Sequence, residues 1–277
     1  MSNELKLKSF SRNVQYFVQK KVLIRGDHYK NGKIQSVVDG NVAVFYKDES
    51  SVRVQKSNLL FDGRRFLKNP VNQCFAKASE VMDDLCFSLS KEGSFLFLEN
   101  RDAVLRKWTN TKLYLERFFV CDDPLVSDRM SGYIESFDSA ISDESLFVSA
   151  IKRDLFYYVF FRGYYRDYGK EGVLSVSSRC DGLLGGVVAT LSENWQFSKE
   201  DGQHCVRMKG CLDRDESEQE GFSNYWGIGS DPKDLRINLE GESFFDDCGI
   251  PIRMNLKLEA MVSPKNSKQI VVSIKRK

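Results

Sequence analysis

The sequence of 277 residues has few of the residue types that common catalytic, secreted and membrane proteins depend on. It holds only 2 His and 5 Pro, and its 7 Cys are irregularly spaced without a CxxC pair. No uncharged apolar run approaches the roughly 18 residues that cross a bilayer. A Ser–His–Asp or Cys–His catalytic centre would have to use one of these two histidines. We therefore expect no disulfide framework, no membrane span, no cofactor and no metal site, and we assign no catalytic residue.

Charge and compartment signals point to a protein of the cell interior. The 41 Lys and Arg nearly balance 39 Asp and Glu, which leaves a formal net charge of +2. A protein that mainly grips a phosphate backbone needs a larger basic excess, so we do not expect a nucleic-acid partner. Residues 1–13 contain no apolar run of signal-peptide length. These features predict a cytoplasmic protein with free thiols.

Residues 1–62 are predicted to be a β-rich N-terminal segment. Short β-branched or aromatic runs, separated by turn signals at 31–32 and 39–41, occur at 22–24, 33–38, 42–45 and 52–54. Two arrangements are open for this segment. It can form a small separate barrel, or it can supply strands to a larger sheet.

Residues 63–277 are predicted to form an α+β main domain that starts with helices. The expected elements are a short helix at 70–80, a hairpin at 85–98, and helices at about 101–120, 126–140 and 143–165. Asn100 can cap the helix that follows it. The helix at 143–165 is apolar around most of its circumference, which is typical of a buried helix.

From residue 172 to residue 276 the hydrophobic period becomes two. The pattern predicts antiparallel strands at 173–177, 187–197, 205–212, 235–244, 252–262 and 270–275. Strands, then helices, then strands indicate a segregated α+β protein and not a doubly wound one. We therefore predict a large curved antiparallel sheet wrapped around the central aromatic helix.

Motifs that would carry catalysis are weak. His204 and Cys205 are adjacent on a predicted strand, so their side chains point to opposite faces. Adjacent acids at 83–84, 122–123 and 246–247 lie in predicted turns or helix ends, where solvated caps explain them. Carboxylates from distant parts of the chain can still converge in a fold. A carboxylate-dependent hydrolase therefore remains an alternative function.

An aromatic pattern in the N-terminal segment suggests a second alternative. Tyr29 follows one predicted strand, and Phe45 and Tyr46 end another strand just before Asp48. In this order residues 20–60 resemble a Tudor or SH3-like small barrel. The resemblance implies a cage of aromatic faces around a cation, and so a reader of methylated Lys or Arg.

A broader resemblance covers residues 70–277. It rests on the hairpin around Gly93, on Asn100 and Trp108, and on the segment DLFYYVFFRGYY at 154–165, followed by the strands in order. In these features the chain is similar to uncharacterised cytoplasmic proteins of Bacteroidetes bacteria. The resemblance implies a bacterial cytoplasmic protein and brings no activity with it.

The preferred prediction is a non-catalytic binding or adaptor protein. A curved sheet over helices offers a concave, apolar-lined mouth for a protein partner or an apolar ligand. Trp195, Tyr225 and Trp226 are candidate aromatics at its rim, besides the four cage positions. The prediction includes a protein partner and no membrane or nucleic acid.

Overall fold

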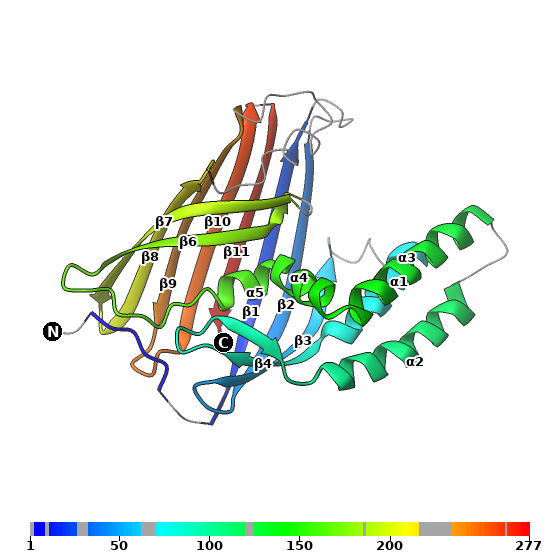
Figure 1. The fold of residues 1–277 in the computed structure, drawn as a ribbon, viewed down its shortest axis with the longest axis horizontal. Helices are drawn as coiled ribbons and strands as arrows, with labels where there is room; N and C mark the ends of the chain where they lie inside the picture. The colour runs from blue at the N-terminus through cyan, green and yellow to red at the C-terminus, as the bar shows by residue number, and fades with distance from the viewer. Residues whose placement is uncertain are drawn as a thin grey trace.

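One antiparallel sheet of 11 strands forms the framework of the protein, as the computed structural model shows (Figure 1). The structure describes residues 3–8, 11–26, 33–61, 70–119, 124–184, 187–215, 234–263 and 265–277. The strand order is β5-β4-β3-β2-β1-β11-β10-β9-β8-β7-β6, so β5 and β6 are the edges of an open sheet. The predicted α+β class with a large curved antiparallel sheet is confirmed.

The three N-terminal strands join this sheet directly. They are β1 (Arg12–Arg25), β2 (Lys33–Tyr46) and β3 (Ser51–Phe61), and β1 pairs with β11 (Asn266–Arg276) on one side and with β2 on the other. They are longer than the short predicted runs. The turn expected at 39–41 is wrong, because Gly40 lies inside β2 opposite Val18 of β1. The turn expected at 31–32 lies outside the described residues.

The C-terminal half supplies the other long strands as predicted. They are β6 (Val173–Leu184), β7 (Val187–Glu200), β8 (Gln203–Leu212), β9 (Arg236–Phe245) and β10 (Pro251–Ser263). Residues of one parity are buried along most of the length of these strands, and on β10 Met254, Leu256 and Leu258 are at most 1% exposed. The hydrophobic period of two therefore selects the concave face, which carries the core.

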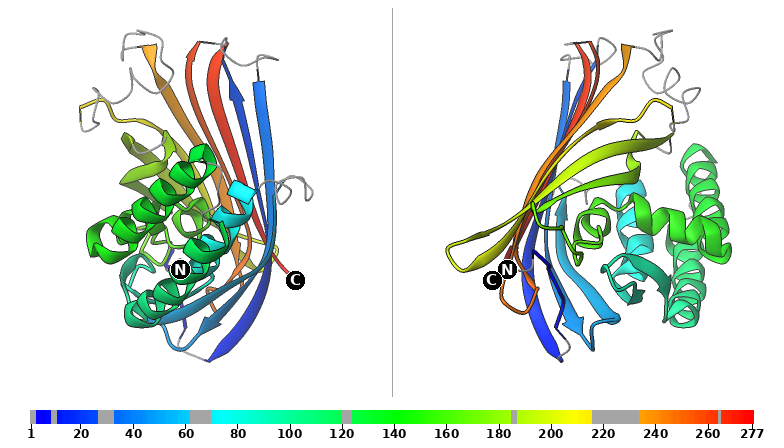
Figure 2. Two further views of the ribbon diagram at one scale, coloured as in Figure 1. Left: turned by 90° about the vertical axis from the view of Figure 1, so that its right-hand side faces the viewer. Right: turned by 60° about the vertical axis from the view of Figure 1, so that its left-hand side comes forward.

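The helices all lie on the concave side of the sheet (Figure 2). Two short strands, β4 (Asp84–Leu89) and β5 (Phe95–Leu98), form the predicted hairpin at the β3 side of the sheet. The first helices are α1 (Pro70–Ser79), the 3-10 turn η2 (Glu80–Met82), α2 (Arg101–Phe119) and α3 (Pro124–Ser142). No helix among the described residues has both the length and the apolar character that crossing a membrane requires.

Asn100 has a different local role from the predicted one. Its side-chain amide group donates to the carbonyl of Asp84 at 3.0 Å and its amide oxygen accepts from the backbone N–H of Cys86 at 2.8 Å. The side chain thus binds the backbone of β4. Only its main-chain carbonyl accepts hydrogen bonds from the first turn of α2. Asn100 fixes the start of α2 against the sheet.

The central aromatic helix is broken into two. α4 (Glu144–Arg153) and α5 (Leu155–Phe160) meet at Asp154, which ends the first and caps the second by accepting from the N–H of Phe156 at 2.9 Å. The predicted single helix over 143–165 is therefore wrong in its continuity and in its end. The expected burial is correct, because Phe156, Tyr157 and Phe160 of α5 are 4–6% exposed.

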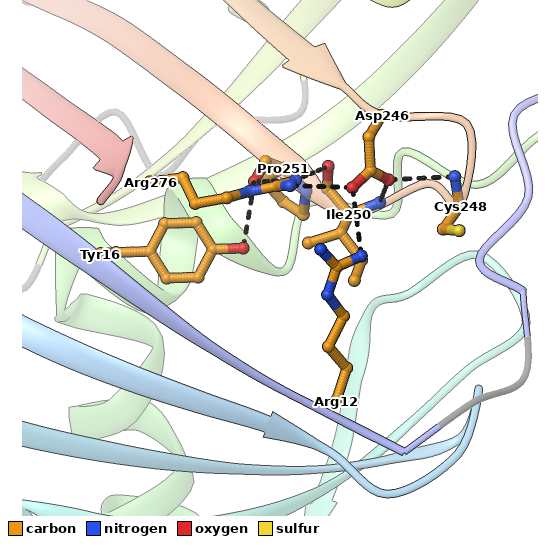
Figure 3. Close-up of polar contacts among 7 residues, drawn as sticks. All are labelled: Arg12, Tyr16, Asp246, Cys248, Ile250, Pro251 and Arg276. Carbon is orange, nitrogen blue, oxygen red and sulfur yellow. Dashed lines mark hydrogen bonds and ion pairs between the residues drawn. The ribbon is translucent and has the colours of Figure 1, made fainter.

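A cluster of polar side chains links β1 and β11 to the turn between β9 and β10, at one end of these strands (Figure 3). The guanidinium of Arg276 on β11 donates to the Asp246 carboxylate at 2.9 Å and to the carbonyls of Ile250 and Pro251. Asp246 also accepts two backbone N–H groups of the turn between β9 and β10. Tyr16 of β1 donates to the Pro251 carbonyl at 3.1 Å. The cluster holds the β9–β10 turn against β1 and β11.

Candidate ligand-binding cavity

A cavity of about 450 Å³ lies between the concave face of the sheet and the helices. Its apolar lining comes from both layers: Val18, Val38, Val42 and Val272 from the strands, and Met82, Phe137, Ala150, Ile151, Phe156 and Tyr157 from the helical side. Four charged or ionisable side chains of the interior also line it, namely Lys20, Lys56, Asp83 and Asp154. This volume falls within the roughly 300–1,000 Å³ of small-molecule pockets.

The strand pattern explains why the sheet side of the cavity is open. The inward positions of β2 run through Val38, Gly40 and Val42, and all three line the cavity. Gly40 contributes no side chain to this wall. A glycine within a strand leaves room for another group to approach the backbone. Gly40, which the sequence analysis placed in a turn, is therefore part of the cavity wall.

Lys56 and Asp154 form an ion pair across the cavity wall, between β3 and the junction of α4 with α5. Burial opposes the charged form of Lys56, but the charge and hydrogen bond of Asp154 outweigh it and raise the pKa of the ammonium group. Burial likewise opposes ionisation of Asp154, and Lys56 outweighs it and lowers the pKa of the carboxyl group. The Lys56 ammonium also lies 4.1 Å from the ring centroid of Tyr157.

Lys20 faces the same cavity from β1 without a counterion. Among the described residues it forms no ion pair and no hydrogen bond. Burial lowers its pKa, and the nearby ammonium groups of Lys268 and Lys56 add to that effect, whereas Asp154 acts against it. A buried cation without a partner is costly in free energy. Lys20 is therefore the side chain of this site with unused binding capacity.

Asp83 contributes the second carboxyl group of the cavity. Burial raises its pKa, while Lys107 and Lys56 act to lower it. Two carboxyl groups with oppositely shifted pKa values are what a carboxylate-dependent hydrolase needs. Asp154, however, uses one oxygen to bind Lys56 and the other to cap α5. The charge of Glu80 also raises the pKa of Asp83, but Glu80 is paired with Lys77. Neither Asp154 nor Glu80 is therefore free to act with Asp83.

A second cavity of about 560 Å³ lies on the other side of the α4–α5 junction, and Ile151 and Tyr157 line both. Its polar centre is the ion pair between Arg162 and Glu193, at 2.5 Å and with both side chains at most 3% exposed. Glu193 also accepts from Ser178 and from the indole N–H of Trp195. These neighbours saturate the Glu193 carboxylate, whereas Nε and Nη1 of Arg162 are buried without a hydrogen-bond partner in the described part of the chain.

The structure describes three of the four predicted cage residues. Tyr29, like Tyr225 and Trp226 of the predicted rim, lies outside the described residues. Phe45 and Tyr46 are consecutive on β2 and so point to opposite faces, Tyr46 into the core at 3% exposure. Asp48 lies in the following turn, where it accepts from the N–H and hydroxyl of Ser50. The structure does not bring Phe45 and Tyr46 together around one cation.

Trp195 is a core residue and not a rim residue. It is 1% exposed, its ring packs at a tilt against Tyr164 with ring centroids 5.4 Å apart, and its indole N–H donates to Glu193 at 2.7 Å. Sequence reasoning missed Lys20, Lys56 and Asp154. The available signal was Lys20 and Lys56 at inward parity on apolar strands, and an Asp directly before the Leu155–Phe160 helix.

No His, Cys, Asp or Glu cluster of three or more in the described ranges has metal-binding geometry.

No protein-family model matches the chain, and no curated protein matches its sequence. The structure is similar to a solved structure titled "Lipid-protein interactions in lipovitellin", with a TM-score of 0.51 and 8% identity. The match covers 96% of this chain and 25% of that one, so the chain spans about a quarter of its length. At this identity the comparison shows the fold alone, which is a large antiparallel sheet with helices.

Proposed function

We propose that the protein binds a small apolar ligand, and that the cavity between the concave sheet face and the helices is the binding site. The observation that carries the proposal is the composition of its wall. Valines from three strands face Met82, Phe137 and Phe156 from the helices across about 450 Å³. Removing apolar surface of a ligand from water into such a site is worth about 25 cal/mol per Å².

Two further observations support an apolar occupant. The exposed residue Ala150 of α4 lines the cavity, which places a route to solvent beside this helix. The similar structure has lipid–protein interactions in its title, and its fold extends over nearly the whole of this chain. A protein partner, which the sequence analysis also predicts, remains a prediction.

The test uses the neutral dye N-phenylnaphthylamine, whose fluorescence rises in apolar surroundings. The protein is expected to give a saturable increase. Ala150→Trp places an indole in the mouth of the cavity and should weaken binding at least about tenfold, which corresponds to about 1.4 kcal/mol.

Leu146→Trp is the matched control. Leu146 is on the same helix, is 50% exposed and lines neither cavity. This variant should bind the dye as the parent protein does. Absence of saturable binding, or equal binding by Ala150→Trp and the parent, would overturn the proposal.

A further inference from the structure

Charge in the cavity is distributed unevenly around the proposed ligand. Lys56 is neutralised by Asp154, and burial favours the neutral form of Asp83. Arg153 lines the cavity but is exposed to solvent. Of the two half-buried lysines of the lining, Lys20 is the one that has no counterion in the described part of the chain. Among the described residues, Lys20 is therefore the ammonium group of the cavity interior that no carboxylate contacts.

We propose that Lys20 is the anchor for the anionic head of the ligand, and that the ligand is a single-chain carboxylate amphiphile of the fatty-acid class. This inference rests on the proposed function, because it assigns the head group of the ligand that the cavity holds. The carboxylate supplies the counterion that Lys20 lacks. The alkyl chain of the ligand extends along the valines beside Gly40.

The single positive charge of Lys20 favours a ligand whose head group carries one negative charge. A lysine is a compact point charge that offers three donors but one unit of charge. A doubly charged phosphate monoester would bring its second charge close to Asp154, which is ionised through its pair with Lys56. Like charges at close range are destabilising. The volume, toward the lower end of the usual pocket range, suits one chain better than two.

The charged groups around Lys20 set how binding responds to pH. Lys56 of β3 and Lys268 of β11 disfavour its charged form, and Asp154 at the α4–α5 junction favours it. Asp83 and Arg153 line the same cavity. Because its pKa is lowered in the folded protein, Lys20 loses its proton over a pH interval below the ordinary lysine value of 10.5. Carboxylate binding should weaken over that interval.

The experiment measures displacement of N-phenylnaphthylamine by myristate and by the fatty alcohol of the same chain length. The parent protein should bind myristate more tightly than the alcohol, by roughly tenfold, as expected for one charged hydrogen bond. Lys20→Met should remove this preference, so that myristate and the alcohol bind this variant with similar affinity. Lys20→Arg should retain the preference and lose its decline toward pH 10, because guanidinium stays protonated.

The outcomes separate the two proposals. If the dye and both competitors fail to bind the parent, the proposed function itself fails. If both competitors bind equally, or Lys20→Met keeps the preference for myristate, the assignment of Lys20 is overturned while apolar binding stands. An alkyl phosphate monoester that binds more tightly than myristate would overturn the singly charged head. Circular dichroism of each variant confirms that the fold is retained.

Discussion

Two cations on the inner face of the same sheet have opposite surroundings. Arg276 lies opposite Tyr16 in the register of β1 with β11, and Lys20 lies four residues further along β1. Arg276 donates to one carboxylate and two carbonyls, whereas Lys20 has neither an ion pair nor a hydrogen bond within the described ranges. Saturated polar groups stabilise a fold, and an unsaturated one weakens it unless a ligand completes it.

The difference between the contacts of Arg276 and Lys20 indicates which region of the protein has polar groups available to a ligand. At the end of the sheet, each polar group meets a partner supplied by the fold (Figure 3). Between β1 and the helices there is a cavity, and the Lys20 side chain lines it together with valines. The first arrangement predicts loss of stability on substitution. The second predicts loss of ligand selectivity with little or no loss of stability.

The largest effect is expected at Arg276. Arg276→Met should lower the free energy of unfolding by about 3 kcal/mol, because it removes the cation paired with the partly buried Asp246 and its hydrogen bonds to two carbonyls. Urea denaturation measures this change. Arg12→Met is the control, since Arg12 is 45% exposed and its guanidinium is 3.6 Å from the same carboxylate. It should cost under about 0.5 kcal/mol. Equal losses for the two variants would contradict the distinction.

An intermediate effect is expected at Asp154, which belongs to the cavity but is paired. Asp154→Asn should cost roughly 1–3 kcal/mol, less than breaking a sealed pair because the Asp154 side chain is 39% exposed toward the cavity. The lowered pKa of Asp154 gives stability that is present above pH 3.8 and is lost as pH falls through the folded value. The parent protein should therefore lose stability in acid more steeply than Asp154→Asn does. Parallel acid profiles would contradict this.

The smallest effect, and one of opposite sign, is expected at Lys20. Lys20→Met should leave stability unchanged or raise it by up to about 1 kcal/mol, because it removes a desolvated charge without a partner. In the parent, folded Lys20 releases its proton below the ordinary value of 10.5, so the unfolded chain holds more protons between these two values. Stability should rise with pH in that window.

The Lys20→Met variant lacks this pH-dependent rise. Thermal unfolding followed at neutral pH and toward pH 10 makes the comparison. A marked destabilisation of Lys20→Met at neutral pH would mean that Lys20 resembles Arg276 after all, and the contrast between the two regions would disappear.

The sequence predicted most elements because their patterns are local. The six C-terminal strands, the hairpin and α1 follow from period-two alternation or helical spacing, and the structure agrees to within a few residues except where β6 runs further. The helix at 143–165 failed for a physical reason. Its apolar run is continuous, but Asp154 breaks it by capping α5 and binding Lys56, nearly a hundred positions earlier in the chain.

The candidate site depended almost entirely on tertiary structure. Lys20 belongs to a basic N-terminal stretch that, taken alone, indicates a solvated sheet face. Its parity with Val14, Tyr16 and Val18 places it inward, but only the pairing of β1 with β11 puts it beneath the helices. Gly40 looked like a turn residue because glycine beside Asp39 and Asn41 is a strong local turn signal.

By itself the sequence determined the α+β class, the alternation that gives the sheet one packed face, and the burial of the aromatic segment, since hydrophobic periodicity is a property of neighbouring residues. The tertiary structure decided that the N-terminal strands extend the C-terminal sheet, that α4 and α5 separate at Asp154, and that Lys20 faces a cavity. These features arise from contacts between residues far apart in the chain, whose partners no local pattern specifies.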